Sequence, residues 1–126
     1  MNIVDSSGWL EYFTGGPKAE AFEKALKNPA RLIVPTISLY EVFKVVMRER
    51  GEDEALQAVA LMRQGQLANL DMDTAIWAAK IGHNLKLPLA DSIIMATGLM
   101  LGATIWTMDD HFKNLLGVKY IPKQKK

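Results

Sequence analysis

The most constraining feature of this sequence is a long, nearly uncharged stretch that runs from Leu87 to Phe112. Between Lys86 and Asp109 the only charged residue is Asp91. The charge-free run behind Asp91 contains two glycines and is shorter than the ~20 apolar residues that span a bilayer. The stretch is therefore expected to lie in a protein core, where an unpartnered carboxylate is costly to desolvate. The lone acid in this core needs a specific partner.

Local signals divide this stretch into a helix and a strand. Pro88 and the apolar spacing behind it predict a helix that begins at Asp91 and ends at Gly102. Residues 103–107 are typical of a buried strand, and Asp109 follows it as the next helix opens. One acid thus opens a helix, and the other follows a strand.

Short apolar runs alternate with helical patterns along the rest of the chain. Strands are predicted at 2–4, 31–34, 66–70 and 118–121, and helices at 6–13, from Pro17, after Pro35, at 52–64 and at 74–85. The 74–85 helix is expected to turn Ile76, Ala79 and Ile81 inward. This alternation predicts an α/β fold with a short, mainly parallel sheet of four to five strands and helices on both faces. We expect a single domain over residues 1–126, with 121–126 as a flexible basic tail.

Composition narrows the cellular context and the chemistry. The chain has no cysteine, which excludes disulfides, thiolate metal sites and cysteine nucleophiles, and suits a reducing cytoplasm. No signal peptide or membrane span is evident, so we expect a cytoplasmic protein. A net charge of +1 does not by itself indicate a nucleic-acid binder, because binding to the phosphate backbone usually needs a strongly basic patch.

Four isolated acids are expected to meet at one edge of the sheet. Asp5 ends the first strand, Asp91 opens a helix and Asp109 follows a strand, whereas Glu41 lies about one and a half turns into a helix. In an open parallel sheet the carboxyl ends of the strands lie along one edge, where ligands bind. The sequence therefore predicts that these four side chains converge.

A simpler interpretation competes with this one. Each aspartate also lies where it could cap a helix, which contributes ~1 kcal/mol, and an isolated glutamate is often a paired surface residue. The combination favours a ligand role, because clustered carboxylates repel one another unless a cation is present.

Oxygen ligands of this kind favour Mg²⁺ or Mn²⁺ and suit phosphodiester hydrolysis by an activated water. The hydroxyls of Ser7 and Thr107 are candidates to assist, although a helix cap and a strand residue are equally good interpretations of these two.

Four motifs make nearly the whole chain resemble the PIN-domain family, in particular the VapC-type toxin ribonucleases of toxin–antitoxin systems. They are Ile3-Val4-Asp5-Ser6-Ser7, Ser38-Leu39-Tyr40-Glu41-Val42, Leu87-Pro88-Leu89-Ala90-Asp91-Ser92-Ile93-Ile94-Met95-Ala96-Thr97 and Thr107-Met108-Asp109-Asp110-His111-Phe112. They occur in the family's order and at approximately its spacing, which makes the resemblance fairly specific.

The resemblance implies a Mg²⁺- or Mn²⁺-dependent endoribonuclease that acts on RNA as the toxin of a toxin–antitoxin system. It implies a homodimer and an antitoxin protein that blocks the site. It also implies metal ligation by Asp5, Glu41, Asp91 and Asp109, with Ser7 and Thr107 in support. Asp110 is the other candidate for the fourth acid, and Asp109 is preferred because it stands two residues after Thr107.

Other residues lie outside this set of proposed site residues. Gly8 stands where the family usually has a bulky β-branched residue and is expected to loosen the first helix. Neither His83 nor His111 is assigned to the site, although His111 lies closer to it in sequence. The aromatic residues are mainly expected in the core, with part of their surface open as an antitoxin groove; they are Trp9, Tyr12, Phe13 and Phe22.

Other functions fit the sequence less well. A receiver domain would show an acidic pair near Asp5, and a haloacid-dehalogenase-type phosphatase would carry a second aspartate where Ser7 stands. No glycine-rich nucleotide-binding motif is present. A non-catalytic PIN-like module that binds RNA or protein remains the alternative.

Overall fold

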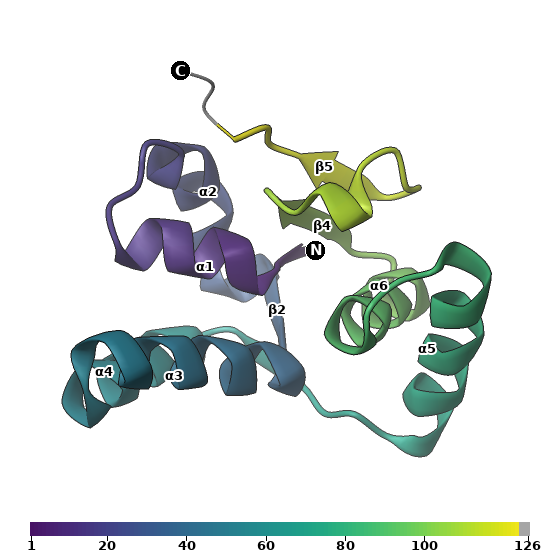
Figure 1. Ribbon diagram of the computed structural model, residues 1–126, viewed down its shortest axis with the longest axis horizontal. Helices are drawn as coiled ribbons and strands as arrows, with labels where there is room; N and C mark the ends of the chain where they lie inside the picture. The colour runs from purple at the N-terminus through teal and green to yellow at the C-terminus, as the bar shows by residue number, and fades with distance from the viewer. Residues whose placement is uncertain (124–126) are drawn as a thin grey trace.

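The computed structural model describes residues 1–123, and in that range five strands and six α-helices form one α/β unit (Figure 1). The strands are β1 (Asn2–Val4), β2 (Leu32–Pro35), β3 (Gln66–Ala68), β4 (Thr104–Thr107) and β5 (Val118–Tyr120). The α-helices are α1 (Ser6–Phe13), α2 (Ala19–Leu26), α3 (Thr36–Arg50), α4 (Glu52–Met62), α5 (Met72–Leu85) and α6 (Leu89–Leu101). Two short 3₁₀ helices are η1 (Pro29–Arg31) and η2 (Asp110–Phe112).

The sheet is parallel throughout, with strand order β3-β2-β1-β4-β5. This confirms the predicted parallel sheet. The N-terminal strand β1 lies at its centre, where Ile3 pairs with Ile33 of β2 and with Ile105 of β4. Because β1 and β4 are parallel neighbours, the residues that follow Val4 lie beside those that follow Thr107.

Side chains alternate between two hydrophobic cores, one on each face of the sheet. Ile3, Ile33 and Ile105 pack with residues of α5 and α6. Val4 and Trp106, each one position further along, pack with residues of α1, α2, α3 and α4. This period of two is the natural repeat of a strand. Helices therefore cover both faces, as predicted.

One helix start differs from the prediction, and another agrees with the capping interpretation. Pro88 is the N-cap of α6, so Asp91 lies in the first turn of that helix rather than at its cap. Asp5 caps α1 by accepting a hydrogen bond from the Gly8 N–H. On α5, Ile81 is buried as predicted. The orientations predicted for Ile76 and Ala79 are wrong, because Ile76 is 52% exposed and Ala79 is exposed as well.

Gly8 tightens the packing of α1 rather than loosening it. A Cβ atom at this position would lie 2.5 Å from Val4 Cγ1 and 2.7 Å from the ring of Phe22. Both neighbours are fully buried. The glycine therefore lets α1 approach β1 and α2 closely, and the expectation of a loosened helix was wrong.

The start of the predicted basic tail is held in place. Ile121 is buried, and its backbone N–H donates to the Thr107 carbonyl at 2.7 Å. Residues 124–126, the last three of that predicted tail, lie outside the described part of the chain. Across residues 1–123, no helix combines the length and the apolar character needed to cross a membrane.

Candidate metal centre

Asp5 is held by three hydrogen bonds at the point where β1 passes into α1. Its carboxylate accepts the Gly8 N–H at 3.2 Å, the Ser7 hydroxyl at 2.6 Å and the Thr107 hydroxyl at 2.8 Å. The side chain is 3% exposed. Asp5 is thus a helix cap, as the simpler interpretation predicts, and is fixed at the carboxyl edge of the sheet.

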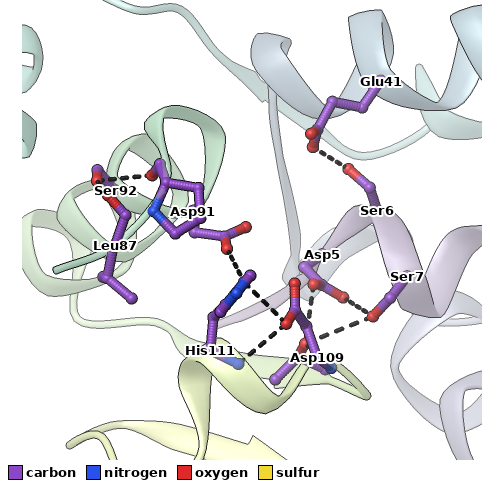
Figure 2. Close-up of polar contacts among 11 residues, drawn as sticks. Asp5, Ser6, Ser7, Glu41, Leu87, Asp91, Ser92, Asp109 and His111 are labelled. Atoms are coloured by element: carbon purple, nitrogen blue, oxygen red, sulfur yellow. Dashed lines mark hydrogen bonds and ion pairs between the residues drawn. The ribbon is translucent and has the colours of Figure 1, made fainter. Parts of the chain in front are cut away.

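The same two hydroxyls connect the ends of β1 and β4. Thr107 Oγ1 accepts the backbone N–H of Asp109 at 2.9 Å, and Ser7 Oγ accepts the backbone N–H of Met108 at 3.1 Å. Residues more than a hundred positions apart in the sequence are therefore held in one polar network (Figure 2). Ser7 and Thr107 lie against the acids, as the sequence predicts.

Asp91, Asp109 and His111 form the tightest group in the site (Figure 2). The Nδ1 atom of His111 lies 2.8 Å from Asp91 Oδ2 and 3.1 Å from Asp109 Oδ1. One ligand atom from each of the three residues lies within 4.8 Å of the other two. The largely buried carboxylate of Asp91 therefore has a specific partner, the more exposed imidazole of His111.

Sequence reasoning did not place His111 in the site. Asp109 caps the 3₁₀ helix η2 by accepting the backbone N–H of His111 at 2.9 Å. This short turn directs the imidazole back between Asp109 and Asp91. The available signal was a histidine two residues after a predicted ligand, at the start of a turn.

Asp110 points to a different partner. It accepts a hydrogen bond from the Tyr120 hydroxyl on β5 and is exposed. Of the two neighbouring acids, the structure brings Asp109 into the group with Asp91 and His111.

Glu41 approaches the group from α3, on the other side of Asp5 (Figure 2). Its carboxylate accepts a hydrogen bond from the Ser6 hydroxyl at 2.5 Å. Glu41, like Asp5, is not a member of the tight three-residue group. Its charge nevertheless contributes to raising the pKa of Asp91. All four predicted acids therefore lie at one edge of the sheet, with Glu41 the most separate.

Burial and mutual repulsion disfavour charge on these acids. Burial raises the pKa of Asp5 to about 6, against the lowering effect of its hydrogen bonds from Ser7, Thr107 and Gly8. Burial and the nearby charge of Asp109 raise the pKa of Asp91 to about 6. The pKa of the His111 imidazole is also raised, by the charge of Asp109 and by its hydrogen bond to Asp91.

The donor set fits a divalent cation. In residues 1–123, none of the four acids forms an ion pair with a lysine or arginine. Carboxylate oxygens are the ligands that Mg²⁺ and Mn²⁺ prefer, and a cation would relieve the repulsion among them. Asp91 and Asp109 are the best-placed ligands, with Asp5 and Glu41 beside them. Such a centre could activate water and stabilise negative charge on a phosphate.

Comparisons with known proteins agree with this architecture. Residues 3–116 match the model of the PIN domain family. A toxin–antitoxin complex from Klebsiella pneumoniae has a similar chain, with a TM-score of 0.79 and 22% identity over 94% of this chain and 96% of that one.

Two further solved structures have the same fold. Mycobacterium tuberculosis VapC20, described as a Sarcin-Ricin loop cleaving toxin, has a TM-score of 0.72 and 16% identity over 88% of this chain and 92% of its own. Rickettsia felis VapBC2, bound to a DNA fragment from its promoter, has a TM-score of 0.73 and 12% identity over 96% of this chain and 97% of that one. A comparison with curated protein sequences found no match. Because the family model spans most of its length, the chain belongs to the PIN domain family.

Proposed function

We propose that this protein is a Mg²⁺- or Mn²⁺-dependent endoribonuclease that hydrolyses RNA phosphodiester bonds. The observation that carries the proposal is the convergence of Asp5, Glu41, Asp91 and Asp109 at one sheet edge, with no lysine or arginine paired to them across the described residues. Membership of the PIN domain family, whose members are nucleases, supports it.

Each residue at the site has a definite task in this proposal. Asp91 and Asp109 would hold the metal, and Asp5 and Glu41 would complete the acidic surface beside it. Ser7 and Thr107 fix the Asp5 carboxylate through their hydroxyls, while Ser6 fixes Glu41. The bound divalent ion supplies Lewis acidity, which activates water and stabilises charge on the phosphate.

The proposed biological role is that of a cytoplasmic toxin held in check by an antitoxin protein. The solved structures of similar fold include toxin–antitoxin complexes. A groove of about 300 Å³ between α1 and the α3–α4 pair offers a docking surface. Its floor is apolar and its rim is charged, which fits an amphipathic helical segment; the lining residues include Leu10, Phe13, Leu61, Glu49, Arg50 and Glu54.

The structure refines the groove predicted from the aromatic residues. Trp9 and Phe22 are buried in the core, whereas Phe13 lines the groove. Phe13→Ser should lose the antitoxin in a pull-down carried out where the variant is still folded by circular dichroism, because loss of the ring that stacks on Trp9 should also lower its unfolding midpoint. A folded variant that still binds the antitoxin would argue against this surface.

The decisive experiment measures cleavage of RNA by the purified, partner-free protein. A structured stem-loop and a single-stranded RNA are incubated with Mg²⁺, Mn²⁺ or EDTA. We expect cleavage with either metal, none in EDTA, and a loss of about 100-fold or more in Asp91→Asn and Asp109→Asn, since metal catalysis contributes several kcal/mol.

Asp110→Asn is the matched control for Asp109→Asn, because it removes the neighbouring charge, which is bonded to Tyr120 instead of the site. It should cleave at close to the wild-type rate. Cleavage in EDTA, or equal cleavage by Asp91→Asn, would refute the proposal. RNA binding without any cleavage would indicate the non-catalytic module.

A further inference from the structure

We propose that His111 is a nitrogen ligand of the metal, and that it shifts the preference of the site from Mg²⁺ towards Mn²⁺. The inference deepens the proposed nuclease function and depends on the metal site assigned there. It rests on the position of the imidazole, whose Nδ1 atom lies between the carboxylates of Asp91 and Asp109 (Figure 2).

The spacing of the three donor atoms fits one octahedral ion. Adjacent ligands of an octahedral ion at about 2.1 Å are separated by about 3 Å, and opposite ligands by about 4.2 Å. His111 Nδ1 lies 2.8 Å from the Asp91 oxygen and 3.1 Å from the Asp109 oxygen. The ligand atoms of all three residues lie within 4.8 Å of one another. The two short separations match adjacent ligand positions.

The position of His111 is set by the backbone as well as by its side-chain contacts. Its N–H is bonded to the Asp109 carboxylate at the start of η2, and Phe112, the next residue, is fully buried. The imidazole side chain is 55% exposed and is not wedged into the core. It is therefore anchored at its base, with its ring beside the acids, and replacing it should leave the fold intact.

A nitrogen donor changes which cation the site prefers. Mg²⁺ strongly favours oxygen ligands, whereas imidazole suits transition metals. Mn²⁺ accepts carboxylates and octahedral geometry as Mg²⁺ does, and it also accepts an imidazole nitrogen. A site built from Asp91, Asp109 and His111 should therefore bind Mn²⁺ more tightly than an all-carboxylate site would.

Electron paramagnetic resonance of Mn²⁺ bound to the purified protein tests this directly, without an activity measurement. A coordinated imidazole couples its ¹⁴N nucleus to the Mn²⁺ electrons, and this coupling is detected by pulsed methods. The chain has two histidines, so His111→Ala and His83→Ala identify the source of the signal. We expect ¹⁴N coupling in the wild type and in His83→Ala, and none in His111→Ala.

Equilibrium binding gives a second, independent readout. The Kd for Mn²⁺ is measured from the free-ion signal and that for Mg²⁺ by competition. In His111→Ala the Mn²⁺ Kd should rise about tenfold or more, since losing even a group that only orients a ligand weakens metal binding about 10- to 100-fold. The Mg²⁺ Kd should rise by a smaller factor than the Mn²⁺ Kd, because Mg²⁺ loses only the ordering of the two carboxylates and not a preferred ligand. His111→Gln retains a hydrogen-bond donor without the imidazole, and it should also lose the coupling.

The outcomes separate this inference from the proposed function. Bound Mn²⁺ without ¹⁴N coupling, an unchanged ratio of the two Kd values in folded His111→Ala, or no Mn²⁺ binding at all would overturn the role of His111. If the same preparation still cleaves RNA and Asp91→Asn does not, the nuclease function stands and only the histidine ligand fails. A ¹⁴N coupling that depends on His111, without cleavage of RNA, would support His111 as a metal ligand and refute the nuclease function.

Discussion

At the scale of single residues, the surroundings of Asp5 favour a hydrogen-bond acceptor but disfavour a negative charge. As the cap of α1 it satisfies the Gly8 N–H, and as a buried acid it has a pKa raised to about 6 by burial. A cap needs only a hydrogen-bond acceptor, which an uncharged side chain also provides. The negative charge of Asp5 therefore lowers the stability of the metal-free fold. A cation bound beside the carboxylate would offset this cost.

The raised pKa of Asp5 predicts an unusual pH dependence of the free energy of unfolding of the metal-free protein. Because the pKa of Asp5 is higher in the folded state than its ordinary 3.8, the folded protein binds more protons between about pH 4 and pH 6. The contribution of Asp5 to stability should therefore fall as the pH rises through that window, and stay low above it. Asp91, whose pKa is also raised to about 6, acts in the same direction.

Urea unfolding in EDTA at several pH values measures the effect. Asp5→Asn keeps an acceptor for Gly8 and removes the charge, but it loses the acceptor for the Thr107 hydroxyl. At pH 7.5 it should be more stable than the wild type by roughly 1 to 2 kcal/mol, since one pKa unit corresponds to about 1.4 kcal/mol and a lost hydrogen bond costs about 1 kcal/mol. Its slope between pH 4 and 6 should be shallower. Asp53→Asn, at an exposed acid on α4, is the control and should follow the wild type. An Asp5→Asn variant that is less stable at pH 7.5 would contradict the account.

At the scale of elements, the position of α1 depends on the absence of a side chain at Gly8. This residue is buried, and any Cβ would meet Val4 and Phe22 at distances that atoms do not tolerate. Since Asp5 caps this helix and Ser7 lies in its first turn, a shift of α1 would also move the acid network.

Gly8→Ala should therefore destabilise the fold, although alanine is normally the better helix former. The expected loss is about 1 to 3 kcal/mol, which is typical of overpacking a core, and it can be measured from the urea midpoint. The clash with Phe22 is isolated by a double-mutant cycle with Phe22→Leu. In that background Gly8→Ala should cost less, because the ring has been removed. Strictly additive losses would show that Phe22 is not the obstacle.

The elements also show where sequence reasoning succeeds and where it stops. The parallel sheet and the convergence of Asp5 with Asp109 were predictable, because strand ends in a parallel sheet share one edge. The bond between His111 and Asp91 was not, because it depends on a single 3₁₀ turn and on the placement of α6 across the sheet. The packing of Gly8 depends on Phe22 of another helix, and no local pattern reports such a contact.

At the scale of the whole molecule, the two faces of the sheet present different outer surfaces. The α1, α3 and α4 side carries the groove with a charged rim. The α5–α6 side exposes large apolar side chains around a cavity of about 170 Å³, with Trp77 53%, Leu99 47% and Met100 44% exposed. Because homodimer interfaces are more apolar than ordinary surfaces, we propose that the homodimer implied by the family resemblance forms through this α5–α6 surface.

Trp77→Glu should convert a dimer to a monomer, because it places a charge at the centre of that apolar surface. Light scattering coupled to gel filtration, over a range of protein concentrations, measures the mass. Leu116→Glu is the control, since Leu116 is 83% exposed and lies outside both helices. A dimer that persists in folded Trp77→Glu would assign the contact elsewhere, and a wild type that is monomeric at all concentrations would refute the dimer.

The central place of β1 in the sheet has a consequence for the order of synthesis. β1 is synthesised before its sheet neighbour β4, and Asp5 is synthesised before Thr107, whose hydroxyl donates a hydrogen bond to it. Asp109 and His111 follow only after that strand. A nascent chain that carries Asp5, Glu41 and even Asp91 still lacks Asp109 and His111, two of the three residues of the tight group. Translation of this chain therefore delays the assembly of the site until residue 111 has been made, so incomplete products cannot form it.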